Sequence, residues 1–169
     1  MPNPPPQLIY PSRLGMVIFQ NQVIKTFRKF QQTDNKKLEA GGQLFAHIKD
    51  KRIEVLHATE PSRKATRGRY FFHPDRKNEQ REIDSAFKKK MHYVGDWHTH
   101  PEPEPSPSSV DIKKISAIVK ISNHEVLALL MVIVGSAHFP EGLWCGWMAQ
   151  DGMSPMTPRR ECEPRDPRI

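Results

Sequence analysis

The sequence predicts a single α/β domain in which a mixed β-sheet is flanked by about three helices. Its 169 residues, of which 37% are hydrophobic, suffice for one compact core but not for two ordinary domains. Segments with the apolar spacing of helices alternate with short apolar runs typical of strands. The 16 prolines fall mainly in residues 2–11, 101–107 and 155–167, which leaves the stretches between them free to form helices and strands.

The first part of the chain predicts one amphipathic helix and a hairpin. Apolar residues recur at steps of four, four and three, at Phe19, Val23, Phe27 and Phe30. This spacing is typical of a helix with one buried face, and we expect that helix over residues 15–37. The glycine pair at 41–42 breaks the pattern, and two strands are expected beyond it, over residues 43–48 and 53–58.

The rest of the chain predicts two more helices and four more strands. Pro74 suits the first position of a helix, because its missing N–H needs no partner there, and Ile83 and Phe87 give that helix its buried side. Either Ser108 or Ser109 caps the other helix. The strands are expected over residues 69–72, 93–97, 126–134 and 143–149. These elements place the domain at residues 15–150, between a proline-rich N-terminal segment, 1–14, and an irregular C-terminal tail, 151–169.

The cysteine content and the lack of long apolar runs indicate where in the cell the protein resides. Two cysteines, Cys145 and Cys162, cannot form a disulfide framework, and they lack the paired spacing of a cysteine zinc site. No apolar run approaches the ~18–20 residues of a membrane span. We therefore expect a cytoplasmic protein that makes no contact with a membrane.

The net charge of +7 raises the question of nucleic-acid binding. Lys and Arg cluster at residues 49–52, 63–69, 76–81 and 88–90. The aromatic residues beside these clusters, 70–72, are consecutive, so a strand would send them to opposite faces rather than build a stacking platform. We expect a solvated basic surface or a docking site for an acidic protein, and no nucleic-acid partner.

Residues 95–111 carry the candidate chemistry. His98 and His100 lie two positions apart at the end of a predicted strand, so both rings project to the same face. Asp111 falls at or near the first turn of the following helix, where free N–H groups and the helix dipole favour a carboxylate. Two imidazoles and one carboxylate leave the fourth position of a tetrahedral zinc ion open, which is typical of a catalytic site.

This segment resembles the JAMM motif of the JAB/MPN metalloprotease family. From His98 to Asp111 the chain reproduces HxHP-x6-S-x2-D without a departure, with Ser108 as the serine. Upstream, Glu39 followed by a glycine pair at the start of a strand matches the glutamate of the family. The resemblance covers about residues 15–150 and implies a cytidine-deaminase-like fold.

The resemblance also implies a role for each residue. His98, His100 and Asp111 would hold one Zn²⁺ ion, and Glu39 would be the general base that activates the attacking water and passes its proton to the leaving amine. Ser108 would donate a hydrogen bond to the oxyanion, which is worth ~10²–10³ in rate, or cap the helix instead, and both roles stay open. Asp96 is a candidate acceptor for an imidazole N–H.

Family members cleave peptide or isopeptide bonds after ubiquitin-like modifiers. The chain is similar in its small size and in two segments, GRYFFHPDR at residues 68–76 and GDWHTHP at residues 95–101, to the bacterial JAB-domain deconjugases of CBASS anti-phage operons. The implied substrate is a protein with an extended C-terminal tail, either a conjugated cGAS-like nucleotidyltransferase or a ubiquitin-like modifier. That tail is expected to bind as an added strand, with the basic loop 63–69 as an exosite.

Two alternatives stay open. One is a non-catalytic MPN scaffold, which the complete motif disfavours. The other is a RadC-like DNA-associated protein, whose HxHP motif also ends in PSxxD, as residues 107–111 do. Its usual serine-glycine after HxHP is Glu102-Pro103 here, which speaks against it.

Overall fold

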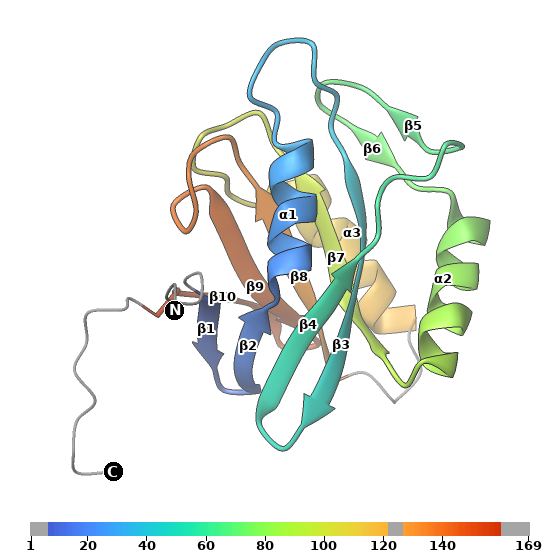
Figure 1. The fold of residues 1–169 in the computed structure, drawn as a ribbon, viewed down its shortest axis with the longest axis vertical. Coiled ribbons are helices and arrows are strands. Elements are labelled where there is room, and N and C mark those ends of the chain that lie inside the picture. Colours follow the sequence, from blue (N-terminus) through green and yellow to red (C-terminus); the bar gives the residue numbers. More distant parts are fainter. Residues whose placement is uncertain (1–6, 122–126, 160–169) are drawn as a thin grey trace, which may run out of the picture.

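The structure is a computed structural model that describes residues 7–121 and 127–159. It contains one mixed eight-stranded sheet in the order β1-β2-β4-β3-β7-β8-β9-β10 and a separate two-stranded sheet, β5-β6 (Figure 1). The strands of the large sheet are β1 (Leu8–Ser12), β2 (Gly15–Phe19), β3 (Gly41–Lys49), β4 (Arg52–Ala58), β7 (His92–Thr99), β8 (Ala128–Val134), β9 (Leu143–Ala149) and β10 (Gly152–Met156). The pairs β2-β4 and β7-β8 are parallel and the others antiparallel, which confirms the mixed α/β class.

Three helices accompany the sheet, as the sequence predicts: α1 (Asn21–Phe30), α2 (Arg76–Lys88) and α3 (Ser109–Ile121). In Figure 1, α1 lies across the near face and α3 lies behind the sheet. Successive side chains of β8 point to opposite faces of the large sheet. Leu130 and Val132 join the core cluster under α1, whereas Leu129 and Met131 join the one under α3. All seven residues of β8 are buried, which confirms the central strand for the part of 126–134 that is described.

The prediction of one helix over residues 15–37 is wrong at both ends. Gly15 to Phe19 form β2, which pairs parallel with β4, and the helix begins only after Gln20. The run Val17 to Phe19 is buried at every position, and a β-branched and aromatic run of this kind packs equally well in a central strand. The helical spacing itself holds for Val23 and Phe27, which are fully buried in α1.

Smaller differences concern strand 69–72 and α2. The expected strand is instead a turn, closed by Gly68 N donating to Phe71 O, between β5 (Thr66–Arg67) and β6 (Phe72–His73). Helix α2 begins at Arg76 behind the N-cap Asp75, whose side chain accepts from Asn78 N. Phe87, expected on the buried side of α2, is 74% exposed.

The two edges of the large sheet approach each other. Strand β1 comes from the segment expected to lie outside the domain, and β10 from the tail expected to be irregular. Arg13 and Asp151 form an ion pair at 3.2 Å, and Trp147 Nε1 donates to Ser12 Oγ at 3.2 Å. Arg159 N also donates to Ile9 O of β1 at 2.8 Å. Cys162 and the rest of residues 160–169 lie outside the described residues.

Within residues 7–121 and 127–159, no helix is long and apolar enough to cross a membrane.

Buried Cys145 of β9 packs in the core as a small apolar residue.

Phe27 of α1 offers a test of the core. Its ring centroid lies 5.3 Å from that of Trp97 and 6.0 Å from that of Phe19. Phe27→Ala should lower the free energy of unfolding by about 3–5 kcal/mol, because a buried aromatic ring is lost. Phe87→Ala, at the exposed position of α2, should change it by no more than about 0.5 kcal/mol. Urea denaturation of both variants measures the difference, and similar losses would contradict the assigned core.

Candidate metal centre

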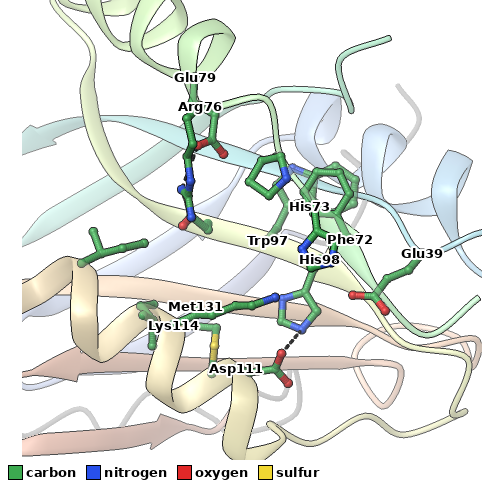
Figure 2. Close-up of a pocket in the computed structure, with 15 residues that line it drawn as sticks. Glu39, Phe72, His73, Arg76, Glu79, Trp97, His98, Asp111, Lys114 and Met131 are labelled. Carbon is green, nitrogen blue, oxygen red and sulfur yellow. Dashed lines mark hydrogen bonds and ion pairs between the residues drawn. The ribbon is translucent and has the colours of Figure 1, made fainter. Parts of the chain in front are cut away.

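His98, His100 and Asp111 converge at the C-terminal end of β7. The two Nε2 atoms of the histidines lie 3.1 Å apart. Asp111 reaches both rings, with Oδ1 at 3.2 Å from His98 Nε2 and Oδ2 at 3.3 Å from His100 Nε2. Figure 2 shows the Asp111 carboxylate directed at the His98 ring. The structure thus brings together the three residues that the sequence nominated as ligands, and among the described residues no other group of His, Cys, Asp and Glu has this geometry.

Strand pairing fixes the two histidines. His98 lies opposite Gly41 of β3 and opposite Ile133 of β8. Just beyond the strand, His100 N donates to Val134 O at 2.9 Å. Side chains alternate across a strand, so both rings lie on one face while Thr99 between them is fully buried on the other.

The first turn of α3 fixes Asp111. Ser108 N and Ser108 Oγ donate to Asp111 Oδ2 at 2.8 and 2.7 Å, and Asp111 N donates back to Ser108 Oγ at 3.1 Å. This reciprocal arrangement is a capping box, with Ile112 N donating to Ser108 O as the first helical bond. Ser108 therefore caps α3 and holds the carboxylate, while its part in catalysis stays a prediction.

The charge states favoured at Asp111 and His98 suit a bound cation. Burial by itself raises the pKa of Asp111, but hydrogen bonds from His100, His98 and Ser108 outweigh it and hold the pKa well below its ordinary range. Burial lowers the pKa of His98, which favours the neutral form of the ring that metal binding requires. For His100 burial also lowers the pKa, but contact with the Asp111 carboxylate outweighs it and the net shift is upward.

The donor set fits a metal ion. Three ligand atoms, two imidazole nitrogens and a carboxylate oxygen, lie within 4.8 Å of one another. This combination suits zinc and leaves one tetrahedral position for a reactant. His100 Nδ1 is buried without a hydrogen-bond partner and lies 3.4 Å from Glu102 Oε2. A ligating imidazole usually donates its second N–H to a carboxylate, and Glu102 is placed for that role.

Glu39 lies beside the cluster without belonging to it. The residue directly precedes Ala40 and β3, and only 8% of it is exposed. Burial raises the pKa of its carboxyl to about 7; the charge of His100 opposes the shift and that of Asp111 adds to it. Figure 2 shows this carboxylate pointing toward the ligands. A buried carboxyl that titrates near neutral pH can both accept and return a proton.

Close packing explains the glycines after Glu39. A Cβ at Gly41 would lie 2.7 Å from the Phe72 ring and from Trp97 O. A Cβ at Gly42 would lie 2.2 Å from Thr59 O. Gly41 therefore lets β3 lie close to both the Phe72 ring of the hairpin and β7, and Gly42 lets it lie close to Thr59 after β4.

Two hollows open on the site from either side. The smaller, of about 130 Å³, lies between β7, α3 and the start of α2. The larger, of about 400 Å³, lies between the hairpin, the loop after His100 and the first turn of α3. Both are lined by Glu39, Phe72, His73, Asp111 and Lys114. The candidate centre thus lies in a groove that extends both ways from the ligands.

Two expectations for neighbouring residues change. Asp96 contacts no imidazole among the hydrogen bonds of the described residues; its Oδ1 accepts from Tyr93 OH at 2.9 Å. Arg67, counted in the basic loop, donates from Nε to Glu39 O at 2.7 Å and from Nη2 to Leu38 O at 3.2 Å. Sequence reasoning missed this contact with the Glu39 segment, and the spacing of the residues gives no signal for it.

Comparison with known proteins agrees with the geometry. Residues 20–149 match the family described as prokaryotic homologs of the JAB domain. An Escherichia coli protein named CD-NTase/cGAS isopeptidase is 29% identical over 133 residues, which cover 77% of this chain and 80% of the relative. A protein of the same name from Pseudomonas aeruginosa is 30% identical over 98 residues, 55% of this chain and 61% of that relative. The probable metalloprotease y4qB of Sinorhizobium fredii is 38% identical over 68 residues, 38% of this chain and 42% of that protein.

A solution structure of a Desulfitobacterium hafniense protein has the same fold, with a TM-score of 0.57 at 16% identity over 83% of this chain and 89% of that one. This likeness shows the fold alone. The family match bears on the site as well as the fold, because the matched residues include Glu39, Ser108 and the three clustered residues. The chain therefore belongs to the prokaryotic JAB-domain family and is a metalloprotease-type hydrolase that acts on peptide or isopeptide bonds.

Proposed function

We propose that this chain is a zinc-dependent isopeptidase that releases a cGAS-like nucleotidyltransferase from proteins to which its C-terminus has been conjugated, as part of anti-phage defence. One observation carries the chemistry: two imidazoles and a carboxylate converge, and a second, uncommitted carboxyl is buried beside them. The substrate class is supported by two relatives named CD-NTase/cGAS isopeptidase. The complete cluster of His98, His100 and Asp111 disfavours the scaffold, and the two relatives named isopeptidase disfavour the RadC-like alternative.

The ligand roles fall to His98, His100 and Asp111, with Ser108 holding the Asp111 carboxylate in place. When bound, zinc supplies a water ligand with a pKa lowered to about 7 and polarises the scissile carbonyl. Glu39 takes a proton from the attacking water and returns it to the leaving amine, a role that suits a buried carboxyl beside the ligands but outside their cluster. We retain Ser108 as a hydrogen-bond donor to the oxyanion. In this role its hydroxyl has to release Asp111 Oδ2 and donate to the substrate oxygen instead.

The groove favours an extended chain as substrate. On the hairpin side its wall carries Tyr70 and Phe71, and on the α3 side Val110, all of them exposed apolar side chains. A C-terminal tail laid between these walls passes directly over the ligands. Backbone bonding of the tail as an added strand would give affinity without demanding one particular sequence.

The basic loop is the proposed exosite for the body of the nucleotidyltransferase. Arg63 and Lys64 are exposed, next to the hairpin. Arg67 is not included, because its guanidinium already binds the backbone of Leu38 and Glu39.

Glu39→Gln tests the base. The amide keeps the shape of the side chain but cannot accept the proton, so cleavage should fall by about 10²–10⁴-fold. Zinc content and the unfolding midpoint should remain those of the wild type, since no ligand changes. Release of the nucleotidyltransferase tail from a lysine isopeptide measures the rate. Turnover near the wild-type level would exclude Glu39 as the base.

His98→Ala tests the metal site. Removing one of three ligands should reduce zinc stoichiometry, measured by inductively coupled plasma mass spectrometry after dialysis, and abolish cleavage together with it. His73→Ala is the matched control, because His73 is exposed and lines both hollows but lies outside the ligand cluster. Full zinc occupancy in His98→Ala, or its loss in His73→Ala, would refute the ligand assignment.

A double charge reversal, Arg63→Glu with Lys64→Glu, tests the exosite. Cleavage of the whole nucleotidyltransferase conjugate should slow by about 10-fold at low salt, because electrostatic steering is lost. Cleavage of a short tail peptide on the same lysine should not change. Lys49→Glu with Lys51→Glu, at the β3-β4 turn, is the control for net charge. An equal loss on both substrates would count against an exosite.

A further inference from the structure

Arg67 is joined to the segment that carries the proposed base. From β5 its Nε donates to Glu39 O at 2.7 Å and its Nη2 donates to Leu38 O at 3.2 Å. The guanidinium carbon also lies 5.8 Å from the centroid of the Phe30 ring, within the range of a cation–π contact. Two carbonyls and one ring thus define both the position and the plane of this side chain.

The segment before β3 depends on such contacts. Residues 31–40 connect α1 to β3 and belong to no strand. Glu39 N donates to Gly68 O of the hairpin turn at 2.7 Å, so hairpin groups bind both backbone polar groups of Glu39. On the other side, Ala40 N donates to Thr99 Oγ1 at 3.0 Å. Glu39 is therefore held between the hairpin and β7.

A second buried bond joins the hairpin to the ligand strand. Gln32 is 3% exposed; its Nε2 donates to Arg69 O at 2.9 Å, and its Oε1 accepts from Thr99 Oγ1 at 2.8 Å. The hairpin is thus tied to Thr99, which lies between the two histidines. Gln32 Nε2 also donates to Lys37 O at 3.3 Å, in the earlier part of the segment, whereas Arg67 binds the carbonyls of Leu38 and Glu39.

We infer that Arg67 is a positioning residue for Glu39: its two-pronged bond to Leu38 O and Glu39 O sets the backbone from which the base reaches the attacking water. The inference rests on the proposed function. Arg67 is not itself among the lining residues of either hollow, and it reaches the site through its bond to Glu39 O. A guanidinium is needed because it presents parallel donors to both carbonyls, whereas a lysine ammonium behaves as a single point charge.

The test compares Arg67→Gln and Arg67→Lys with Arg81→Gln, a change at an exposed arginine of α2 that lines neither hollow. On the short tail–lysine isopeptide, Arg67→Gln should lower kcat by about 10²-fold, the effect expected of a catalytic group displaced by about 1 Å, and leave KM nearly unchanged. Arg67→Lys should lie between the wild type and Arg67→Gln. Arg81→Gln should match the wild type, and all four proteins should bind zinc equally.

Amide hydrogen exchange gives a readout independent of cleavage. In Arg67→Gln the amides of Glu39 and Ala40 should exchange at least about 10-fold faster, because a lost charged hydrogen bond frees the segment. Amides of β8 serve as the internal reference. If Arg67→Gln does not fold, the Arg67→Lys variant decides the question by the same two measurements.

A double mutant separates positioning from general destabilisation. In the Glu39→Gln background, Arg67→Gln should cause no further loss of rate, because no base remains to be positioned. An additional 10²-fold loss there, a rise in KM with kcat unchanged, or unaltered exchange at Glu39 would overturn the inference. Retained turnover in Glu39→Gln alone would instead refute the proposed function, while the exchange data would still report whether Arg67 holds the segment.

Discussion

The hydrogen bonds of Thr99 determine where the two histidines point. Thr99 is fully buried; its hydroxyl donates to Gln32 and accepts from Ala40 N, and its own N–H donates to Ala40 O. Because side chains alternate across a strand, anchoring this hydroxyl on one face commits His98 and His100 to the other. The same bonds attach Ala40, and with it Glu39, to the ligand strand. One buried threonine thus joins the strand of the two clustered histidines to the segment that carries Glu39.

Asp111 has two tasks that reinforce each other. In the capping box its carboxylate satisfies N–H and O–H groups of Ser108, and in the cluster it faces both imidazoles. The cap fixes the rotamer of a side chain that would otherwise move freely at the start of a helix. Local helix formation therefore prepares the ligand before any metal binds, which reduces the ordering that binding must bring about.

Much of this arrangement could be predicted from the sequence, because it depends on local periodicity. Alternation along β7 and the helix start at Ser108 are sufficient to bring His98, His100 and Asp111 together. Glu39 lies far upstream, and only the family resemblance identified it. The run Val17 to Phe19 fits a helix and a strand equally well, and its pairing with β4 decided the outcome. The contact of Arg67 with Glu39 depends on how the hairpin folds back, and no local pattern encodes it.

The approach of β1 to β10 has a consequence for how copies of the chain meet. Open sheet edges are templates for strand-to-strand association. Here the edges lean toward one another, joined by Arg13 and Asp151, and Arg159 N occupies Ile9 O of β1. These contacts bring the two edge strands of the sheet close together, and one of them occupies a backbone carbonyl of β1. Pairing of a second copy of the chain along these edges is thereby hindered.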